Sequence, residues 1–291
     1  MSINVVVLAA GQGSRMKSSL PKVLHPVGGK AMVQHVVDHA VGLGDVDIHV
    51  VIGHGAEQVK AALTDQPVSF AVQAEQLGTG HAVAQAMPSV GKDGVVLVLY
   101  GDVPLTRPET MQALVDIAGE GKLGLLTVEL SDPTGYGRII RNEANKVVAI
   151  VEQKDASVDQ LAIRETNTGI LAVPTEQLAQ WLPRLSSENA QGEYYLTDII
   201  AMAAEDCIEI QAIQPNSEQE VQGVNNRLQQ AQLERWYQLQ QAEKLMVGGV
   251  TLADPSRLDI RGTVKHGHDV VIDVNVIFEG TVVLGDNVII E

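Results

Sequence analysis

The chain has 291 residues, of which 36 are acidic and 20 are basic, so its formal net charge is −16. Such an excess of negative charge argues against nucleic acid or an anionic membrane as the partner. The single cysteine, Cys207, excludes an intramolecular disulfide framework and is typical of a reducing compartment, so we expect a cytoplasmic protein. No run of about 20 apolar residues is present to span a bilayer.

A glycine-containing turn follows the first predicted strand. Residues 3–9 are an apolar, β-branched run without preceding basic residues, which predicts a strand and not a signal peptide. The sequence LAAGQGSRMKSSLPKVL then occupies residues 8–24. Glycines directly after a strand commonly bring the backbone close to a phosphate. The dinucleotide fingerprint GxGxxG and the triphosphate loop GxxxxGK[ST] both require glycine where this chain has Met16, so the turn matches neither.

The N-terminal segment differs in charge from the rest of the chain. Residues 1–37 contain no Asp or Glu, yet they include Arg15, Lys17, Lys22 and Lys30. A cationic segment in an acidic protein indicates a local anion pocket. A solvated basic face is the alternative.

Predicted strands alternate with predicted helices through the first part of the chain. Strands are expected at 3–9, 47–52, 68–72, 95–100, 123–129, 147–151, 169–173 and 208–213, and amphipathic helices at 31–42, 56–64, 79–88 and 109–119. Nearly continuous apolar strands in this alternation predict an α/β fold with a mainly parallel sheet covered on both faces. Ligands of such sheets bind beyond the carboxyl ends of the strands, where the glycine turn lies.

Other polar motifs follow predicted strands. In YGDVP, Asp102 is a hard oxygen donor that suits Mg²⁺, although capping of a turn before Pro104 is an equal alternative. QAEQLGTGHA, at residues 73–82, suits binding of an anion or a base edge, or ordinary capping of a helix. GYGRI, Glu152 and ETNTGI supply small, amide and carboxylate groups of the kind that bind sugars.

The composition changes after Gly223. Residues 225–247 lack Gly and Pro and are rich in Gln, Leu and Ala, which predicts a long helical arm between two bodies. From residue 260 the chain divides into hexads, which are typical of a parallel β-helix. The expected parts are therefore residues 1–224, 225–249 and 250–291. Apolar residues begin every hexad except the one at His266, namely Ile260, Ile272, Phe278, Leu284 and Ile290.

The ordered motifs resemble those of a known enzyme family. The turn is similar to the (L)xxGxGxRM…PKxL pattern of sugar-nucleotide pyrophosphorylases, in which Met16 belongs to a third type of triphosphate site. QAEQLGTGHA, YGDVPL, DPTGYGRI, NTGI, GEYYLTD and GVNNR follow in that order. Over essentially the whole chain they resemble the bacterial bifunctional N-acetylglucosamine-1-phosphate uridyltransferase/glucosamine-1-phosphate acetyltransferases.

The resemblance implies a Rossmann-like nucleotidyltransferase domain, a helical arm and the start of a left-handed β-helix. It implies Mg²⁺-dependent transfer from UTP to N-acetylglucosamine 1-phosphate, giving UDP-N-acetylglucosamine and pyrophosphate for peptidoglycan and lipopolysaccharide precursors. The family is homotrimeric, and its acetyltransferase site needs a longer β-helix than one that stops at Glu291. We therefore expect that second activity to be missing here, and the chain to be monomeric or weakly associated.

The resemblance also implies site residues, position by position. Arg15 and Lys22 would stabilise the transferring and leaving phosphates, and Asp102 and Asn225 would bind Mg²⁺. The nucleotide would contact Leu8, Ala9, Ala10, Gly11, Gln73, Gly78 and Thr79. The UDP-sugar would contact Tyr100, Gly101, Asp102, Gly137, Glu152, Asn167, Tyr195, Thr197 and Asn225.

Two alternative functions stay open. One is a pyrophosphorylase for another sugar, such as glucose 1-phosphate with UTP or dTTP. The other is a catalytically silent nucleotide-binding or assembly module, against which the joint retention of Arg15, Lys22, Asp102 and Asn225 argues. A NAD-dependent oxidoreductase is disfavoured by Met16.

Overall fold

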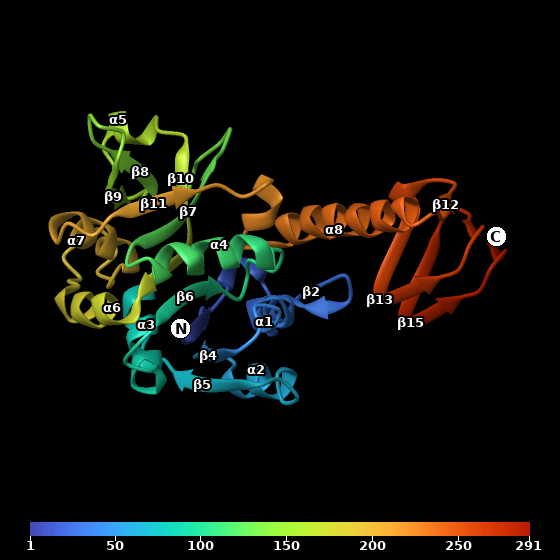
Figure 1. Cartoon of the computed structure of the whole chain (residues 1–291), viewed down its shortest axis with the longest axis horizontal. Helices are drawn as coiled ribbons and strands as arrows, with labels where there is room; N and C mark the ends of the chain where they lie inside the picture. Colours follow the sequence, from blue (N-terminus) through green and yellow to red (C-terminus); the bar gives the residue numbers. More distant parts are fainter.

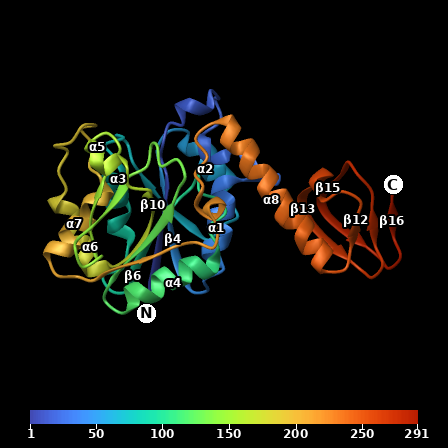
Figure 2. The same ribbon diagram turned by 90° about the horizontal axis from the view of Figure 1, so that it is seen from above.

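The computed structural model describes all 291 residues (Figure 1). It contains a sheet body, whose strands lie between Ile3 and Ile213, the long helix α8 (Arg227–Val247) and a coil body, whose strands lie between Thr251 and Ile290. Figures 1 and 2 show α8 leaving the sheet body and carrying the coil body at its far end. None of the helices combines the length and the apolar character that a membrane crossing requires.

A nine-stranded mixed sheet forms the centre of the sheet body. Its main path has the order β11-β7-β10-β6-β1-β4-β5, and β8 and β9 pair beside β10. β1, β4, β5 and β6 run parallel, as does β11 with β7. The strands are β1 (Ile3–Ala9), β4 (Val46–Ile52), β5 (Val68–Val72), β6 (Val95–Tyr100), β7 (Leu123–Glu129), β8 (Arg138–Arg141), β9 (Val147–Val151), β10 (Glu165–Pro174) and β11 (Ile210–Ile213).

The expectation of a mainly parallel sheet is wrong for one half of it. β10 pairs antiparallel with β6, β7 and β8, and β8 with β9. The turn between β8 and β9 is too short for the helical crossover that parallel neighbours need, so these strands form a hairpin. β8 is not among the strands expected from apolar runs, because only two apolar residues lie between Arg138 and Arg141. Arg138 is nevertheless buried, and its guanidinium donates to the side chain of Gln153 at 2.9 Å.

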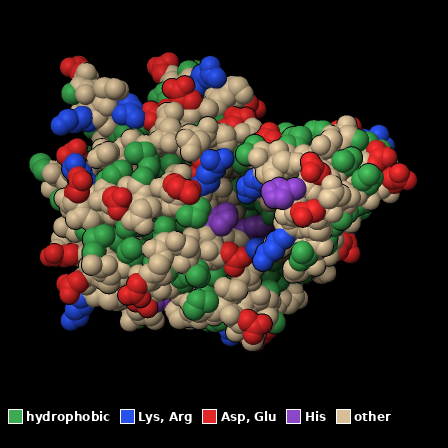
Figure 3. All heavy atoms as spheres, turned by 45° about the vertical axis from the view of Figure 1, so that its right-hand side comes forward, with side chains coloured by type: hydrophobic (Ala, Val, Ile, Leu, Met, Phe, Trp, Pro, Cys, Tyr) green, Lys and Arg blue, Asp and Glu red, His purple; other side chains and the backbone are tan.

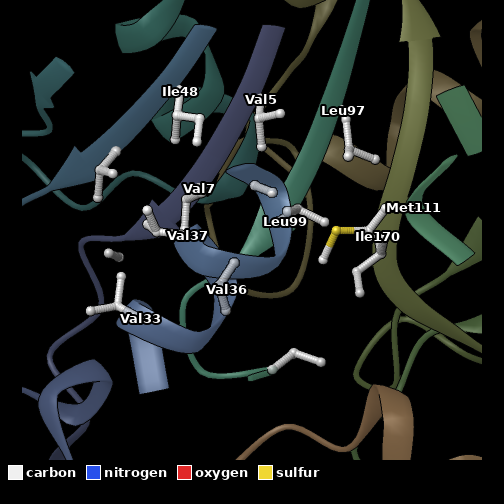
Figure 4. Close-up of a cluster of buried hydrophobic side chains, with 14 of the residues drawn as sticks. Val5, Val7, Val33, Val36, Val37, Ile48, Leu97, Leu99, Met111 and Ile170 are labelled. Atoms are coloured by element: carbon white, nitrogen blue, oxygen red, sulfur yellow. The ribbon is translucent and has the colours of Figure 1, made fainter. Parts of the chain in front are cut away.

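Helices cover both faces of the sheet, as expected. α1, α2 and α4 pack on one face, and α3, α6 and α7 on the other (Figure 2). Along β1, Val5 and Val7 face the first group while Val6 and Leu8 face the second, which is the alternation of an extended strand. Figure 4 shows the first group, with Val5 and Val7 beside α1. The helices are α1 (Met32–Val41), α2 (Ala56–Ala62), α3 (Thr79–Ala86), α4 (Pro108–Gly119), α5 (Val158–Leu161), α6 (Thr175–Trp181) and α7 (Ile199–Glu205).

The coil body consists of short parallel strands. Leu258 lies opposite Val276 and Val271 opposite Ile289, an offset of 18 residues that equals three hexads. The first residues of the hexads point inward, and those at 260, 272 and 278 are buried. The strands are β12 (Thr251–Leu252), β13 (Leu258–His266), β14 (Val271–Ile272), β15 (Val276–Leu284) and β16 (Ile289–Ile290).

α8 contacts both bodies. The buried amide of Gln238 donates to the carbonyl of Ile260 at 3.0 Å and accepts from its N–H at 2.7 Å. On the other side, Glu234 accepts the N–H of Gly28 at 2.7 Å, between β2 (Pro26–Val27) and β3 (Lys30–Ala31). Gly28 has a φ of +58°, and a Cβ there would lie 2.2 Å from the Tyr237 ring, so only glycine fits. Figure 3 shows Lys, Arg and His side chains in the hollow between the two bodies.

Candidate functional site

The glycine turn after β1 carries the first part of the site. Gly13 has a φ of +62°, and a Cβ at this position would lie 2.5 Å from the Cβ of Lys22. The turn therefore needs glycine both for its left-handed backbone and for its close approach to Lys22. Around Gly11 the space is open, because a Cβ there would meet nothing within 4 Å. The backbone at Gly11 is thus accessible to a ligand.

Met16 has a structural reason to stand where other phosphate loops have glycine. Its side chain is 1% exposed and packs in a small cluster with Leu105, Val224 and Leu233. Its carbonyl accepts a hydrogen bond from Nε of Arg227 at 3.3 Å. The side chain of Met16 therefore fixes the turn against the segments that follow β6 and precede α8.

Four polar side chains from three distant parts of the sequence meet beside this turn. The ammonium of Lys22 forms an ion pair with Asp102 and donates to Oδ1 of Asn225 at 3.3 Å. Arg15 donates to the same Oδ1 at 2.8 Å. The Lys22 and Asp102 side chains are only 16% and 14% exposed. The N–H of Val224 also donates to the carbonyl of Asp102 at 3.0 Å, which joins the two loops directly.

A cavity of about 320 Å³ lies next to these side chains. Ten of the predicted site residues line it, namely Leu8, Ala9, Ala10, Gly11, Lys22, Gln73, Gly78, Thr79, Tyr100 and Asp102. The amide of Gln73 donates to the carbonyl of Gly78 at 3.1 Å, so it holds the loop before α3 in place. The glycine turn, the loop before α3 and the end of β6 thus enclose one space.

Four further residues line the cavity, and the sequence analysis did not single them out. They are Val23, Gln76, Ala82 and Glu193. Gln76 donates its amide to the carbonyl of Ala10 at 2.8 Å, between two predicted nucleotide-binding segments. Gln76 lies inside the motif QAEQLGTGHA, three residues after Gln73, and this position in the motif could have marked it as a site residue. Glu193 lies likewise in GEYYLTD.

The predicted sugar-binding residues form a second group around Glu152. The hydroxyl of Thr197 donates to Glu152 at 3.0 Å, and a Cβ on Gly137 would lie 3.4 Å from the same carboxylate. The N–H of Asn167 donates to the carbonyl of Gly137 at 2.9 Å. Burial raises the pKa of Glu152, and neighbouring carboxylates, first that of Asp198, raise it further.

Tyr195 belongs to the margin of this second group. Its phenol donates to the carboxylate of Asp155 at 3.3 Å and not to Glu152. Burial raises the pKa of this phenol, and the negative charges of Asp155 and Glu152 add to the effect. Tyr195 is therefore hydrogen-bonded to Asp155 and not to Glu152.

Tyr100 and Gly101 connect the two groups. Burial raises the pKa of the Tyr100 phenol, and the charges of Glu152 and Asp102 raise it further. Its ring packs on Gly169, where a Cβ would lie 2.5 Å from a ring carbon. The N–H of Gly101 donates to the carbonyl of Leu8 at 2.9 Å. The cavity and the Glu152 group therefore belong to one extended site.

Chemically, this arrangement suits a polyphosphate. Two cationic side chains stand at the carboxyl ends of β1 and β6, where open α/β sheets bind their ligands. No group of three or more His, Cys, Asp or Glu side chains is arranged to hold a metal ion by protein ligands alone. A metal bound here would need oxygen atoms from the ligand and from water.

Comparison with known proteins agrees with this chemistry. The family model described as the MobA-like NTP transferase domain matches residues 5–156. The chain is 62% identical over 288 residues to the bifunctional protein GlmU of Marinobacter nauticus, and 59% identical to that of Stutzerimonas stutzeri. These matches cover 99% of this chain but only 63% and 64% of the two relatives, so the chain spans less than two thirds of their length. They confirm the resemblance that the ordered motifs indicate.

Solved structures share the fold of the sheet body. UDP-glucose pyrophosphorylase in complex with UDP-glucose matches with a TM-score of 0.66 at 17% identity, over 81% of this chain and 98% of that one. A nucleotidyl transferase from Methanothermobacter thermautotroptrophicus matches with a TM-score of 0.59 at 20% identity, over 81% and 97%. The predicted Rossmann-like nucleotidyltransferase fold is thereby confirmed.

Proposed function

Because the chain belongs to the family of MobA-like NTP transferases and is a nucleotidyltransferase, we propose that it transfers the uridylyl group of UTP to N-acetylglucosamine 1-phosphate. The products are UDP-N-acetylglucosamine and pyrophosphate. One observation carries the proposal: Arg15, Lys22, Asp102 and Asn225 converge beside a cavity at the carboxyl end of the sheet. Support for a nucleotide sugar also comes from the pyrophosphorylase of similar fold, which binds UDP-glucose.

The reaction joins two anions. A phosphate oxygen of the sugar phosphate attacks the α-phosphorus of UTP, and a new P–O bond forms. The bond from this phosphorus to the oxygen that bridges it to the β-phosphate breaks, and pyrophosphate leaves with the electron pair. No covalent bond to the enzyme is needed, because positioning and neutralisation of charge supply the catalysis.

Lys22 and Arg15 supply the positive charge. Lys22 lines the cavity, and Asp102 and Asn225 hold its ammonium group in place before substrate arrives. Arg15 is held by Asn225 and stays exposed, so it can follow charge that moves toward the leaving pyrophosphate. Cations fixed in advance stabilise a transition state without the cost of reorganisation.

Each end of the site is assigned to one of the two substrates. We assign the base and ribose to the cavity lined by Leu8–Gly11, Gln73, Gly78 and Thr79. The N-acetylglucosamine part is assigned to the group around Glu152, where Asn167, Thr197 and the backbone of Gly137 offer partners for hydroxyl and amide groups. Tyr100 lines the cavity and packs on Gly169 near Asn167, so we assign the reacting phosphates to the space beside Asp102.

The residues present fit a Mg²⁺ ion. Asp102 and Asn225 are hard oxygen donors, and both already accept from one cation, the Lys22 ammonium group. Mg²⁺ keeps several waters and typically takes one or two protein ligands together with substrate phosphates. When bound, it would neutralise phosphate charge and help to orient the phosphates. Asp102 and Asn225 would hold it.

For the rest of the chain, we propose the division into residues 1–224, 225–249 and 250–291. The offset of three hexads between paired strands supports the start of a β-helix of hexapeptide repeats in the coil body. Left-handed winding of its coils is part of the same proposal, taken from the resemblance. The sheet body holds all of the residues assigned to substrate except Asn225, so uridylyl transfer is a property of that body.

The test is release of pyrophosphate from UTP and N-acetylglucosamine 1-phosphate in the presence of Mg²⁺. Release is expected only when both substrates are present, and EDTA should abolish it. Glucose 1-phosphate and dTTP, offered separately, measure the selectivity for sugar and for base. Equal or faster turnover with glucose 1-phosphate would replace the proposed substrate by its closest rival. Binding of UTP without turnover of any sugar phosphate would contradict an enzymatic role.

A further inference from the structure

A buried carboxylate lies behind the proposed metal ligands. Glu220, in the short 3-10 helix Glu218–Val221 between β11 and α8, is fully buried. Its Oε1 accepts from the N–H of Arg107 at 3.2 Å and from the hydroxyl of Thr110 at 2.5 Å. Its Oε2 accepts the N–H of Asn216 at 3.3 Å. Burying a carboxylate costs free energy unless hydrogen-bond donors replace the water around it. These donors form a network that holds Glu220 in place.

The network has its centre at the N-terminus of α4. Arg107 is the N-cap residue of this helix, and its own side chain makes no capping hydrogen bond. The carboxylate of Glu220, from a distant segment, accepts the N–H of Arg107 itself, and its negative charge lies at the helix N-terminus, where such charge is favourable. In addition, the hydroxyl of Thr106 donates to the backbone carbonyl of Glu220 at 3.3 Å. Two connections that lie far apart in sequence are thereby joined.

Each of these connections carries one proposed metal ligand. Asp102 lies near the start of the connection from β6 to α4, and Asn225 lies near the end of the connection from β11 to α8. The only other direct hydrogen bond between the two segments is the one from Val224 to Asp102, at 3.0 Å. Without the Glu220 carboxylate, the two segments would still be joined by that bond, by the bond from Thr106 and by the packing of Leu105 and Val224, but the N-terminus of α4 would lose its link to the second segment. Metal sites lose affinity when the groups that orient their ligands are removed.

We propose that Glu220 is a positioning residue that sets the separation of Asp102 and Asn225, and so tunes the affinity of the site for a divalent cation. It touches neither the metal nor the substrates and acts through α4 and the two loops. The proposal rests on the proposed function only in the choice of Asp102 and Asn225 as metal ligands. It does not depend on which sugar phosphate is the substrate.

The experiment measures Mn²⁺ binding by electron paramagnetic resonance, with a non-hydrolysable UTP analogue present. Glu220→Ala leaves three donors without an acceptor and should weaken Mn²⁺ binding about tenfold or more, the scale known for outer residues of metal sites. Glu220→Gln keeps one carbonyl acceptor and should weaken it less. The matched control is Glu165→Gln. Glu165 is also mostly buried and bonded, to Arg141 and Thr127, but contacts neither loop.

Amide hydrogen exchange gives a second measurement. Glu220→Gln, which keeps the size of the side chain and one acceptor, should raise exchange both in residues 101–107 and in residues 214–226. The proposal is overturned if folded Glu220 variants bind Mn²⁺ as the unchanged protein does. It is equally overturned if Glu165→Gln weakens binding as much, because the effect would then reflect general destabilisation. Weakened Mn²⁺ binding in a protein that releases no pyrophosphate would refute the proposed function and leave this inference standing.

Discussion

The sheet body and the coil body bury their apolar side chains in different ways. The sheet body has two clusters of 26 and 23 buried residues, one on each face of the sheet, and each is closed by helices of the same body. The coil body has one cluster of eight, which includes Ala242 and Leu245 of α8. The sheet body therefore holds a core of its own, whereas the core of the coil body depends on the arm.

The coil body also exposes apolar side chains on its outer surface. Along the coils, Ile277, Val283 and Ile289 are 52%, 71% and 67% exposed. A solenoid coil buries only its inward side chains, and the outward ones are covered only by neighbours. This contrast gives a physical reason for assigning the proposed chemistry to the sheet body. Precise placement of charged groups needs loops anchored on a core, as Met16 anchors the glycine turn.

The largest expected effect is on stability and tests this difference in cores. Leu97 lies in the middle of the sheet and is fully buried (Figure 4). Leu97→Ala should lower the free energy of unfolding by about 2–5 kcal/mol, from lost burial and a residual cavity. Ile277→Thr in the coil body keeps a β-branched side chain at an exposed position and should change it by less than about 0.5 kcal/mol. Chemical denaturation measures both. Similar losses from the two variants would remove the distinction between the bodies.

The next effect concerns buried histidines, which occur in the sheet body only. His35 on α1 is 4% exposed and donates from Nε2 to the carbonyl of Val27 at 2.8 Å. Burial lowers its pKa to about 4. The unfolded chain takes up this proton near pH 6.5, whereas the folded chain takes it up only near pH 4. His35 therefore does not lower the free energy of unfolding above pH 6.5. As the pH falls from about 6.5 to 4, the free energy of unfolding decreases by about 3 kcal/mol at most because of this residue.

His35→Gln keeps a donor for Val27 but cannot titrate. The measurement is the free energy of unfolding between pH 7 and pH 4, for which the variant should show a flatter dependence than the unchanged protein. His268→Gln, in the coil body, replaces an exposed histidine and serves as the control. Identical slopes for the His35 variant and the unchanged protein would show that this proton does not govern acid stability.

The third effect is on catalysis. Arg15→Ala should lower kcat about 10²-fold or more with a smaller change in KM, because the charge matters most in the transition state. Arg257→Ala is the matched control, since Arg257 belongs to the coil body and its side chain donates to Asn275 there. Steady-state release of pyrophosphate measures both variants. A near-normal kcat for Arg15→Ala, or an equal loss for Arg257→Ala, would contradict the assignment of the chemistry to the sheet body.

How far the sequence predicts the fold depends on whether a signal is local. β1, β5 and β6 are observed where the apolar runs at 3–9, 68–72 and 95–100 predict them. The direction of β10 was not predictable in this way. An apolar run carries no information on whether its neighbours run parallel or antiparallel, which is decided by connections and pairing across the sheet.

The same holds for the site. The turn after β1 is visible in the sequence because strand, glycines and cations are adjacent. The meeting of Asp102 with Asn225 was expected only from resemblance, since contacts across such a separation leave no periodic pattern. Glu220 lies in the polar run NSEQE, which is typical of an exposed loop. Its burial arises from packing against α4, so local composition gives the opposite expectation.

The smallest effect tests the link between the two bodies. Gln238 joins α8 to β13 through two hydrogen bonds with the backbone of Ile260, at 2.7 and 3.0 Å. Gln238→Ala removes both and should cost about 1–3 kcal/mol, because the N–H and the carbonyl of the buried Ile260 are left without a partner. Since the core of the coil body depends on α8, calorimetry should show an earlier transition of the coil body. Unfolding of the sheet body should be unchanged.

Gln240→Ala, which removes a side-chain contact to Glu243 on the surface of α8, should shift neither transition. A shift of both transitions by Gln238→Ala would mean that the two bodies unfold as one unit, and the difference between their cores would then have no consequence for their stability.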